Sequence, residues 1–268
     1  MATYISEHAS VHADANIGHD VHIGPYSVVG SEATIGDGCR LENSVTLLGR
    51  VSLGANNRIY PYTVIGAPPQ DLTYRGEPTE VRIGSNNIIR ESVTINQATC
   101  KEARITAIGD DCYLMAGCHI AHDCQLRDGI VVANAVLLGG HVHIDSHANL
   151  SGGLAVHHYA SIGAHAFVTG LSRVIHDAPP YMVVDGSPAR PRCVNIVGLK
   201  RNEFSPSVIR ALSEAHRLLY RQQAPLDDVR ETLRTENQLY PAVNHLLNFI
   251  QLNEEGCHGR SRAKRRAG

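Results

Sequence analysis

The chain has 268 residues, of which 43% are hydrophobic, and it contains no tryptophan and only three phenylalanines. Its core must therefore be built from aliphatic and small side chains. The formal net charge of −2 excludes the chain-wide basic field of many nucleic-acid-binding proteins. No apolar run approaches the ~20 residues that span a bilayer, and the first residues lack a signal-peptide layout, so we expect a cytoplasmic protein without membrane insertion.

An aliphatic residue recurs at every sixth position along most of the chain. The first run is Ile5, Val11, Ile17, Ile23, Val29, Ile35, Leu41, Leu47, Leu53, Ile59 and Ile65. Two further runs are Ile83, Ile89 and Ile95, and then Ile108, Leu114, Ile120, Leu126, Val132, Leu138, Ile144, Leu150, Val156, Ile162, Val168 and Val174. A period of six predicts an all-β solenoid, the parallel β-helix of hexapeptide repeats, in which three short strands form each triangular coil of about 18 residues.

Seven cysteines are present, and an odd number argues against a disulfide framework. Within each repeat the fifth position is usually small, and four cysteines occupy it: Cys39, Cys112, Cys118 and Cys124. The six-residue spacing of the last three could suggest a metal site. We favour the simpler interpretation that they fill small inward positions, as buried free cysteine often does.

Two segments interrupt the repeat. Residues 67–79 (APPQDLTYRGEPT) are polar and rich in proline, and residues 97–107 (QATCKEARITA) shift the register by one. We predict that both leave the coil as loops. Long loops on a rigid scaffold usually carry function.

The repeat ends near residue 178, and helical periodicity follows. We predict a β-helix over residues 1–190 and a C-terminal α-helical domain over residues 191–255. Ser205 is a candidate N-cap with Pro206 at the first helical position, and residues 225–233 and 241–250 should form two more helices. Residues 256–268 are basic and rich in small residues, so we expect a disordered, solvated tail rather than a nucleic-acid-binding one.

Many of the 16 histidines lie in the last part of the repeat, at positions that should project outward. Residues 18 apart should stack on neighbouring coils about one strand spacing apart, which places His122 beside Gly140 and Asp123 beside His141. A histidine next to a carboxylate and a glycine amide can serve as a general base with an oxyanion donor. Two alternatives are histidines that only decorate a surface, and zinc ligation as in the γ-class carbonic anhydrases.

Several strings match a known family: Gln70-Asp71-Leu72, residues 75–79 (RGEPT), residues 89–95 (IRESVTI), residues 119–124 (HIAHDC), residues 139–142 (GGHV), residues 155–157 (AVH), residues 179–181 (PPY) and residues 198–201 (GLKR). On these strings the chain resembles the UDP-N-acetylglucosamine O-acyltransferases that begin lipid A synthesis, over roughly residues 5 to 250. The HIAHDC string followed by GLKR and helices is the most specific part of the match.

The resemblance implies a left-handed β-helix and a homotrimer with its sites between subunits. It implies transfer of a (3R)-3-hydroxyacyl chain from acyl carrier protein to the 3-position of UDP-N-acetylglucosamine, with no cofactor and no metal. In this family pattern His122 would be the general base, Asp123 would orient it, and the Gly140 amide would stabilise the oxyanion.

The same resemblance assigns substrate-binding roles. His119, His141 and His157 would line the sugar-nucleotide and pantetheine site. Gln70 and Asp71, on the first loop, would contact the glucosamine.

Two further assignments follow from the resemblance. Asn195 and Arg201 would hold the nucleotide, and Gly170 corresponds to the position that limits acyl length. An acidic acyl carrier protein would meet a basic surface made of Lys200, Arg201, Arg210, Arg217 and Arg221.

Four residues depart from the family pattern. Thr73 replaces a usual lysine, Asn96 a histidine, Val197 a glutamate and Cys193 a glycine. The catalytic pair is retained, but the identity of the sugar nucleotide stays open. The alternatives are the related N-acyltransferase that acts later in the same pathway, on a modified UDP-sugar, and a non-catalytic β-helix scaffold.

Overall fold

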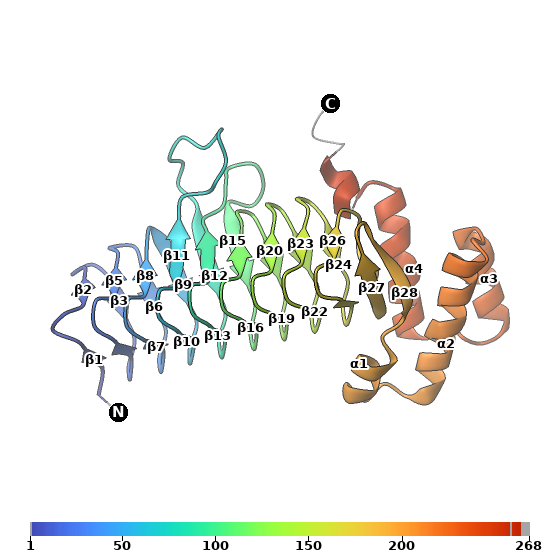
Figure 1. Ribbon diagram of the computed structural model, residues 1–268, viewed down its shortest axis with the longest axis horizontal. Coiled ribbons are helices and arrows are strands. Elements are labelled where there is room, and N and C mark those ends of the chain that lie inside the picture. The colour runs from blue at the N-terminus through green and yellow to red at the C-terminus, as the bar shows by residue number, and fades with distance from the viewer. Residues whose placement is uncertain (1, 258, 264–268) are drawn as a thin grey trace.

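The computed structural model describes residues 2–257 and 259–263. The described chain forms a long triangular prism of stacked coils, with helices gathered at its C-terminal end (Figure 1). Three sheets make the faces of the prism, and the chain passes from sheet A to sheet B to sheet C in each coil. We name the edges between them the A–B, B–C and C–A edges.

Sheet A contains β1 (Tyr4–Ile5), β4 (His22–Ile23), β7 (Arg40–Leu41), β10 (Arg58–Ile59), β13 (Ile88–Ile89), β16 (Tyr113–Leu114), β19 (Val131–Val132), β22 (Asn149–Leu150), β25 (Phe167–Val168), β27 (Met182–Gly186) and β28 (Ala189–Val194). Sheet B contains β2 (Ser10–Val11), β5 (Val28–Val29), β8 (Thr46–Leu47), β11 (Val64–Ala67), β14 (Thr94–Asn96), β17 (His119–Ile120), β20 (Leu137–Leu138), β23 (Ala155–Val156) and β26 (Arg173–Val174). Sheet C contains β3 (Asn16–Ile17), β6 (Thr34–Ile35), β9 (Arg50–Leu53), β12 (Glu80–Ile83), β15 (Ile105–Ile108), β18 (Gln125–Leu126), β21 (His143–Ile144) and β24 (Ser161–Ile162).

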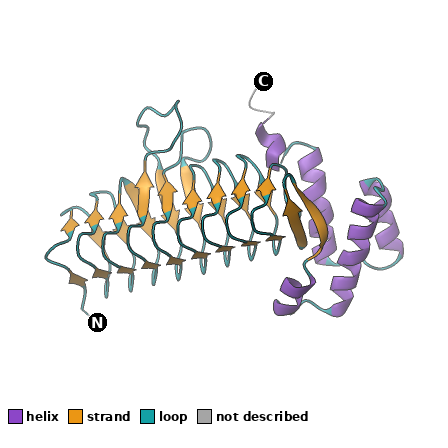
Figure 2. Ribbon diagram, in the orientation of Figure 1, coloured by secondary structure: helices purple, strands orange, loops and turns teal. Residues whose placement is uncertain are grey.

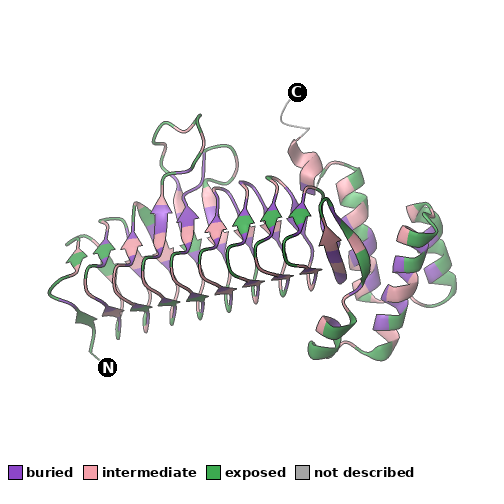
Figure 3. Ribbon diagram, viewed as in Figure 1, coloured by how far each residue is buried: buried purple, intermediate pink, exposed green. Residues whose placement is uncertain are grey.

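Neighbouring strands within each sheet are parallel, apart from the antiparallel pair β27 and β28 (Figure 2). The register confirms the predicted coil length, because His119 of β17 pairs with Leu137 of β20, 18 residues later. Almost every residue of the six-residue period is buried inside the prism. Figure 3 shows buried residues interspersed with intermediate and exposed ones along the coils, as expected when alternate side chains point inward. Ile5 is 44% exposed because it lies in the first coil, at the open end of the stack.

The four cysteines assigned to small inward positions are buried free thiols, as predicted. Burial raises the pKa of Cys112 and of Cys118 to about 11 and that of Cys124 to about 12. These thiols therefore stay protonated at neutral pH and fill space in the core.

Both predicted loops leave the prism on the same side (Figure 1). The first runs from residue 68 to 79, between β11 and β12. The second runs from residue 97 to 104, because β15 already begins at Ile105 and pairs in register with β12. The predicted end of this loop at residue 107 is therefore wrong. Strand pairing resumes at Ile105, three residues before Ile108, where the six-residue aliphatic period resumes.

The prism ends in the antiparallel hairpin β27–β28, so the predicted domain boundary at residue 190 falls inside β28. Polar and proline residues in this hairpin hid the strand from the sequence pattern. The helical elements are α1 (Ile196–Arg201), α2 (Pro206–His216), the π-helix η1 (Arg217–Arg221), α3 (Leu226–Thr235), α4 (Pro241–Glu254) and the 3₁₀ turn η2 (Gly259–Ser261).

The side chain of Ser205 accepts a hydrogen bond from the Val208 amide, which confirms it as the N-cap of α2. The predicted helices at 225–233 and 241–250 are confirmed as α3 and α4, whereas α1 was not predicted. Within the described residues, every helix is too short or too polar to cross a bilayer.

The prediction of a disordered tail from residue 256 is wrong for residues 259–263. The Arg260 amide donates to both oxygens of the Asp177 carboxylate (3.0 and 3.1 Å), and Ser261 donates to the Asn253 carbonyl (2.7 Å). These anchors hold the segment against the end of the prism. The rest of the predicted tail, residues 258 and 264–268, lies outside the described residues.

Candidate active site

His122 and Asp123 lie together at the B–C edge, in the turn between β17 and β18. The Nδ1 atom of His122 is 2.8 Å from Oδ2 of Asp123. An ionised carboxylate only accepts hydrogen bonds, so Nδ1 carries the proton and Nε2 is left with its lone pair. The His122 side chain is 12% exposed and the Asp123 side chain 1%. This is the arrangement of an oriented general base.

The predicted stacking of His122 on Gly140 is confirmed. A methyl group at Gly140 would lie 2.4 Å from Cε1 and 2.6 Å from Nε2 of His122, so only glycine admits the ring at this distance. No described residue accepts a hydrogen bond from the Gly140 amide. An amide donor beside the basic nitrogen is the geometry required to stabilise a developing oxyanion.

The second loop holds Asp123 from above. The backbone amide of Thr99 donates to both carboxylate oxygens (3.2 and 3.1 Å), and its hydroxyl donates to Oδ2 (2.7 Å). Thr106 accepts from the Asp123 amide at 2.9 Å. Burial alone would raise the pKa of Asp123, but the hydrogen bonds from His122 and Thr99 outweigh it and hold the pKa below its usual value. Sequence reasoning missed both threonines, because no periodic signal marks a contact from a loop (Thr99) or from the first residues of β15 (Thr106).

His141 was expected to project outward from the prism, and it does so, yet it is only 3% exposed. Its Nδ1 is 3.1 Å from a carboxylate oxygen of Glu102 on the second loop, and its Nε2 is 3.7 Å from Asp123. Its ring stacks on Tyr159 with centroids 4.3 Å apart and meets His122 edge-on at 5.1 Å. The second loop therefore buries the histidine cluster within a single chain. The sequence pattern predicted that these side chains lie uncovered on an outer face of the prism.

The ligating atoms of His122, Asp123 and His141 all lie within 4.8 Å of one another. Two imidazoles and a carboxylate can hold a divalent ion such as zinc. In this chain, however, the Nδ1 of His122 and the Asp123 carboxylate bond to each other, which occupies one candidate ligand atom on each. The hydrogen-bonded arrangement therefore fits a base and its orienting carboxylate better than a ligand set.

Two other predicted histidines border the cluster. His119 is on β17, where its Nδ1 is 2.8 Å from the hydroxyl of Thr94, and burial lowers its pKa. His157 lies further along the same edge, with its Nδ1 2.6 Å from a guanidinium nitrogen of Arg260. Because arginine only donates, this nitrogen accepts and Nε2 carries the proton.

Gln70 and Asp71 lie on the first loop, where Gln70 is exposed. Asp71 accepts hydrogen bonds from the amide of Thr73 (2.8 Å) and its hydroxyl (2.6 Å), and it forms an ion pair with Lys101 of the second loop (2.5 Å). These partners, chiefly Lys101, hold the pKa of Asp71 well below its usual value. The two loops are therefore joined to each other beside the cluster.

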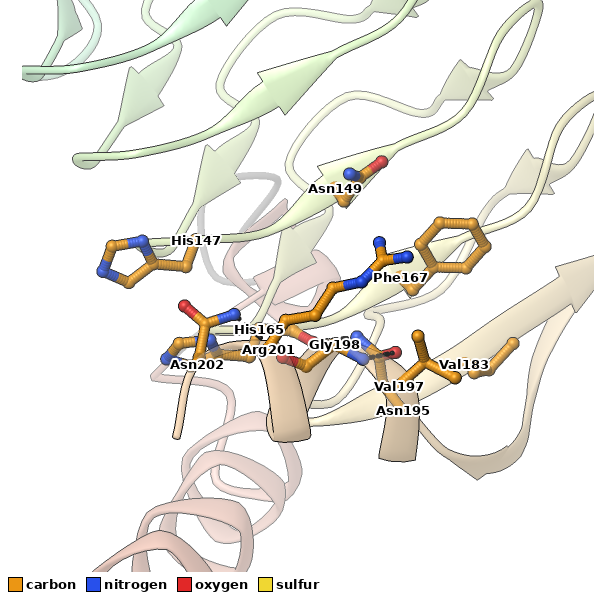
Figure 4. A pocket seen from close by; sticks show the side chains of 10 residues that line it. All are labelled: His147, Asn149, His165, Phe167, Val183, Asn195, Val197, Gly198, Arg201 and Asn202. Carbon is orange, nitrogen blue, oxygen red and sulfur yellow. Dashed lines mark hydrogen bonds between the residues drawn. The ribbon is translucent and has the colours of Figure 1, made fainter. Parts of the chain in front are cut away.

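Asn195 and Arg201 line a separate pocket of about 450 Å³, at the C–A edge. Figure 4 shows its lining, in which His147, Asn149, His165, Phe167 and Val183 come from the prism side, and Asn195, Val197, Gly198, Arg201 and Asn202 come from α1 and its flanks. The size, the aromatic faces and one guanidinium suit a base and its phosphate.

Two details of this pocket modify the expectations. The Asn195 amide caps α1 by accepting from the Gly198 amide (3.1 Å), and it donates to the His165 carbonyl (2.9 Å), so part of its hydrogen-bonding capacity is already used. Burial, with His147 nearby, lowers the pKa of His165 to about 4, so this ring is neutral at neutral pH. Val197, a departure from the family pattern, is 62% exposed on the pocket wall.

Gly170 lies at the A–B edge, in the turn between β25 and β26, and Gly152 is beneath it as predicted. A methyl group at Gly170 would meet the Gly152 carbonyl at 3.2 Å, and the positive φ of this turn is at Leu171 rather than at the glycine. The backbone thus does not require glycine at position 170. Within one chain, the base, the nucleotide candidates and the acyl-length candidate lie at three different edges.

Known proteins resemble this chain over most of its length. A family model described as "Udp N-acetylglucosamine O-acyltransferase; Domain 2" matches residues 177–258. The acyl-[acyl-carrier-protein]–UDP-N-acetylglucosamine O-acyltransferase of Thermodesulfovibrio yellowstonii is 41% identical over 94% of this chain and 98% of its own length. The Synechocystis protein of the same name is 44% identical over 77% of this chain and 74% of its own.

Solved structures lead to the same group. The UDP-N-acetylglucosamine acyltransferase of Bacteroides fragilis superposes with a TM-score of 0.90 at 33% identity, covering 92% of this chain and 97% of that one. The Arabidopsis enzyme gives a TM-score of 0.83 at 33% identity, with 96% and 99% covered. The predicted left-handed parallel β-helix with C-terminal helices is thereby confirmed. The chain belongs to the UDP-N-acetylglucosamine O-acyltransferase family.

Proposed function

We propose that this protein transfers a (3R)-3-hydroxyacyl chain from acyl carrier protein to the 3-hydroxyl of UDP-N-acetylglucosamine, the first step of lipid A synthesis, without a cofactor. The names of its relatives support the substrates. The observation that carries the proposal is the set formed by His122, Asp123 and the Gly140 amide, which brings a base, its orienting group and an oxyanion donor together from two stacked turns of the B–C edge.

The reaction follows from these positions. The Nε2 of His122 takes the proton of the sugar hydroxyl as its oxygen attacks the thioester carbon, and the negative charge that develops on the carbonyl oxygen is stabilised by the Gly140 amide. Asp123 stabilises the imidazolium. When the tetrahedral intermediate collapses, the C–S bond breaks, and the imidazolium returns the proton to the departing thiolate, so that an ester and a free thiol leave.

We propose that the working form is a homotrimer. The nucleotide candidates lie at the C–A edge and the base at the B–C edge of the same prism, so one chain alone does not bring them together. A second copy placed alongside would bring the C–A edge of one chain to the B–C edge of the next, and a threefold ring would close this arrangement.

The acyl carrier protein requires a docking surface. Arg210, Arg217 and Arg221 line a common hollow beside β28 and α2, and Lys200 and Arg201 are exposed nearby on α1. We propose that this basic surface receives the acidic carrier protein. Opposite charge would mainly raise the association rate, so the apparent affinity should fall with added salt.

The test is His122→Ala. The loss of a positioned general base should lower kcat by about 10²–10⁴-fold, while sedimentation and thermal unfolding stay unchanged. His8→Ala, an exposed histidine of the first coils, is the matched control. A His122→Ala protein that retains activity within a few-fold of the wild type would show that another group is the base.

The second candidate is N-acylation of an amino sugar nucleotide, as in the related enzyme of the same pathway. Three departures from the family pattern support this second candidate, because they lie beside the places where substrate would bind. Thr73 is on the first loop, Asn96 is at the base of that loop, and Val197 lines the candidate nucleotide pocket. Alkaline hydrolysis separates the two, since an ester is cleaved under mild base and an amide is not.

A further inference from the structure

The C-terminal segment 259–263 lies against the B–C edge, where the histidine cluster is. Gly259 permits this placement, because it has φ +60° and a methyl group there would lie 2.0 Å from the Asp177 carboxylate. Only glycine can approach that carboxylate so closely. The segment is therefore seated at a defined place on the prism.

From this seat Arg262 reaches the cluster. Its Nη2 donates to the carbonyl oxygen of His141 (2.7 Å), and its Nη1 donates to Nε2 of His143 (2.8 Å). Nη1 is also 3.7 Å from a carboxylate oxygen of Glu102, and the two side chains are only 14% and 16% exposed. The guanidinium lies above the ring of Tyr159, 5.7 Å from its centroid.

We infer that the C-terminal segment belongs to the active site, and that Arg262 is a positioning residue that acts through Glu102 and His141. This inference rests on the function proposed above.

The contacts form a continuous path. Glu102 lies between Arg262 (3.7 Å) and Nδ1 of His141 (3.1 Å), and His141 in turn approaches Asp123 (3.7 Å). Its ring also meets His122 edge-on at 5.1 Å. Removal of the arginine would take away a positive charge that this largely buried carboxylate faces, which weakens its hold in the cluster. Glu102 would then turn towards water and release the ring that abuts the base and its carboxylate.

Arg262→Ala in the full-length chain tests the inference. We expect kcat to fall about tenfold, because His122 would be displaced by well under 1 Å. The KM values for the sugar nucleotide and the acyl carrier protein should stay within about twofold of the wild-type values. Arg262→Lys should recover part of this loss, since it restores the charge next to Glu102. Arg234→Ala, which removes an exposed ion pair with Glu231 on α3, is the matched control and should leave kcat unchanged.

A double-mutant cycle between Arg262 and Glu102 measures their energetic coupling, which general destabilisation of the fold would not produce. Glu102→Gln should lower kcat by a similar factor, and the double variant with Arg262→Ala should be no slower than the worse single variant. Multiplicative losses in the double variant, or an Arg262→Ala protein with wild-type kcat, would overturn the inference. A rise in KM alone would also overturn it, because that result would mean that Arg262 contacts a substrate instead of positioning His141.

A structural measurement keeps the inference separate from the proposed function. Carbethoxylation of individual histidines by diethyl pyrocarbonate, followed by mass spectrometry, should be faster at His141 in Arg262→Ala than in the wild type. It should not change at His141 in Arg234→Ala. If the wild type fails to acylate the sugar nucleotide, the proposed function is wrong, and the rate at His141 still decides whether Arg262 holds this ring.

Discussion

Gly140→Ala should disable the base by steric displacement alone. The added methyl group would lie 2.4 Å from Cε1 of His122, and contacts under 3.0 Å are essentially never found for a real Cβ atom. The ring must therefore retreat by about 1 Å to reach an ordinary 3.4 Å contact. Such a retreat either breaks the 2.8 Å hydrogen bond to Asp123 or moves Nε2 away from the oxyanion donor.

The magnitude follows from that displacement. A misplacement of 1 Å can cost about 10²-fold in rate, and the total contribution of a general base, about 10²–10⁴-fold, sets the upper limit. The colliding atoms belong to a side chain, and φ at Gly140 is not positive, so the backbone can keep its path. We therefore expect a stability loss of no more than ~1–3 kcal/mol from overpacking.

The assay is single-turnover formation of acylated sugar nucleotide, read by mass spectrometry, together with thermal unfolding. Gly30→Ala, in a distant coil, is the matched control, because the nearest neighbour of its methyl group would be the Leu47 carbonyl oxygen at 3.3 Å. Wild-type turnover by Gly140→Ala would refute the close stacking of His122 on this glycine. Loss of folding in Gly140→Ala but not in Gly30→Ala would refute the argument that the backbone tolerates the change.

Three further predictions test other parts of the account. Gly170→Met should fold normally and shift the preference from acyl donors of about 12 to 16 carbons towards shorter ones. Each methylene that loses its apolar contact forfeits up to ~0.8 kcal/mol of binding free energy. An unchanged chain-length profile would show that Gly170 does not line the acyl groove. The folded pKa of Asp123 lies below its unfolded value of about 3.9, so its stabilisation should be complete at neutral pH and be lost as pH falls below about 4. Urea unfolding from pH 3 to 7 should therefore show that the difference in free energy of unfolding between the wild type and Asp123→Asn narrows as the pH falls. A difference that stays constant over this range would contradict the prediction. Chelators should leave turnover intact, whereas stoichiometric zinc at His122 and His141, with activity lost on chelation and restored by metal, would favour the metal-site alternative.

The sequence predicted the parts of the molecule that repeat. A period of six fixes the coil length, and a coil of 18 residues then places His122 beside Gly140 and Asp123 beside His141 without any coordinates. Each coil repeats the backbone path of its neighbour, so a sequence separation converts directly into a distance.

The remainder of the site comes from segments that do not repeat. Thr99 and Glu102 hold the cluster from a loop, and Arg262 comes from a tail that composition alone describes as solvated. Their positions depend on contacts among residues far apart in sequence, for which no local pattern exists. The hairpin β27–β28 was missed for a related reason, because its proline and arginine residues carry no strand periodicity.

The central claim is tested most directly by mass spectrometry of the product that the wild-type protein forms from 3-hydroxyacyl carrier protein and a panel of UDP-sugars. The account predicts a single acyl group on UDP-N-acetylglucosamine, released by mild alkali as an ester is. Transfer only to an amino sugar nucleotide, giving an alkali-stable amide, would contradict the assigned acceptor. The absence of transfer to every UDP-sugar of the panel would contradict the claim that this protein is an acyltransferase.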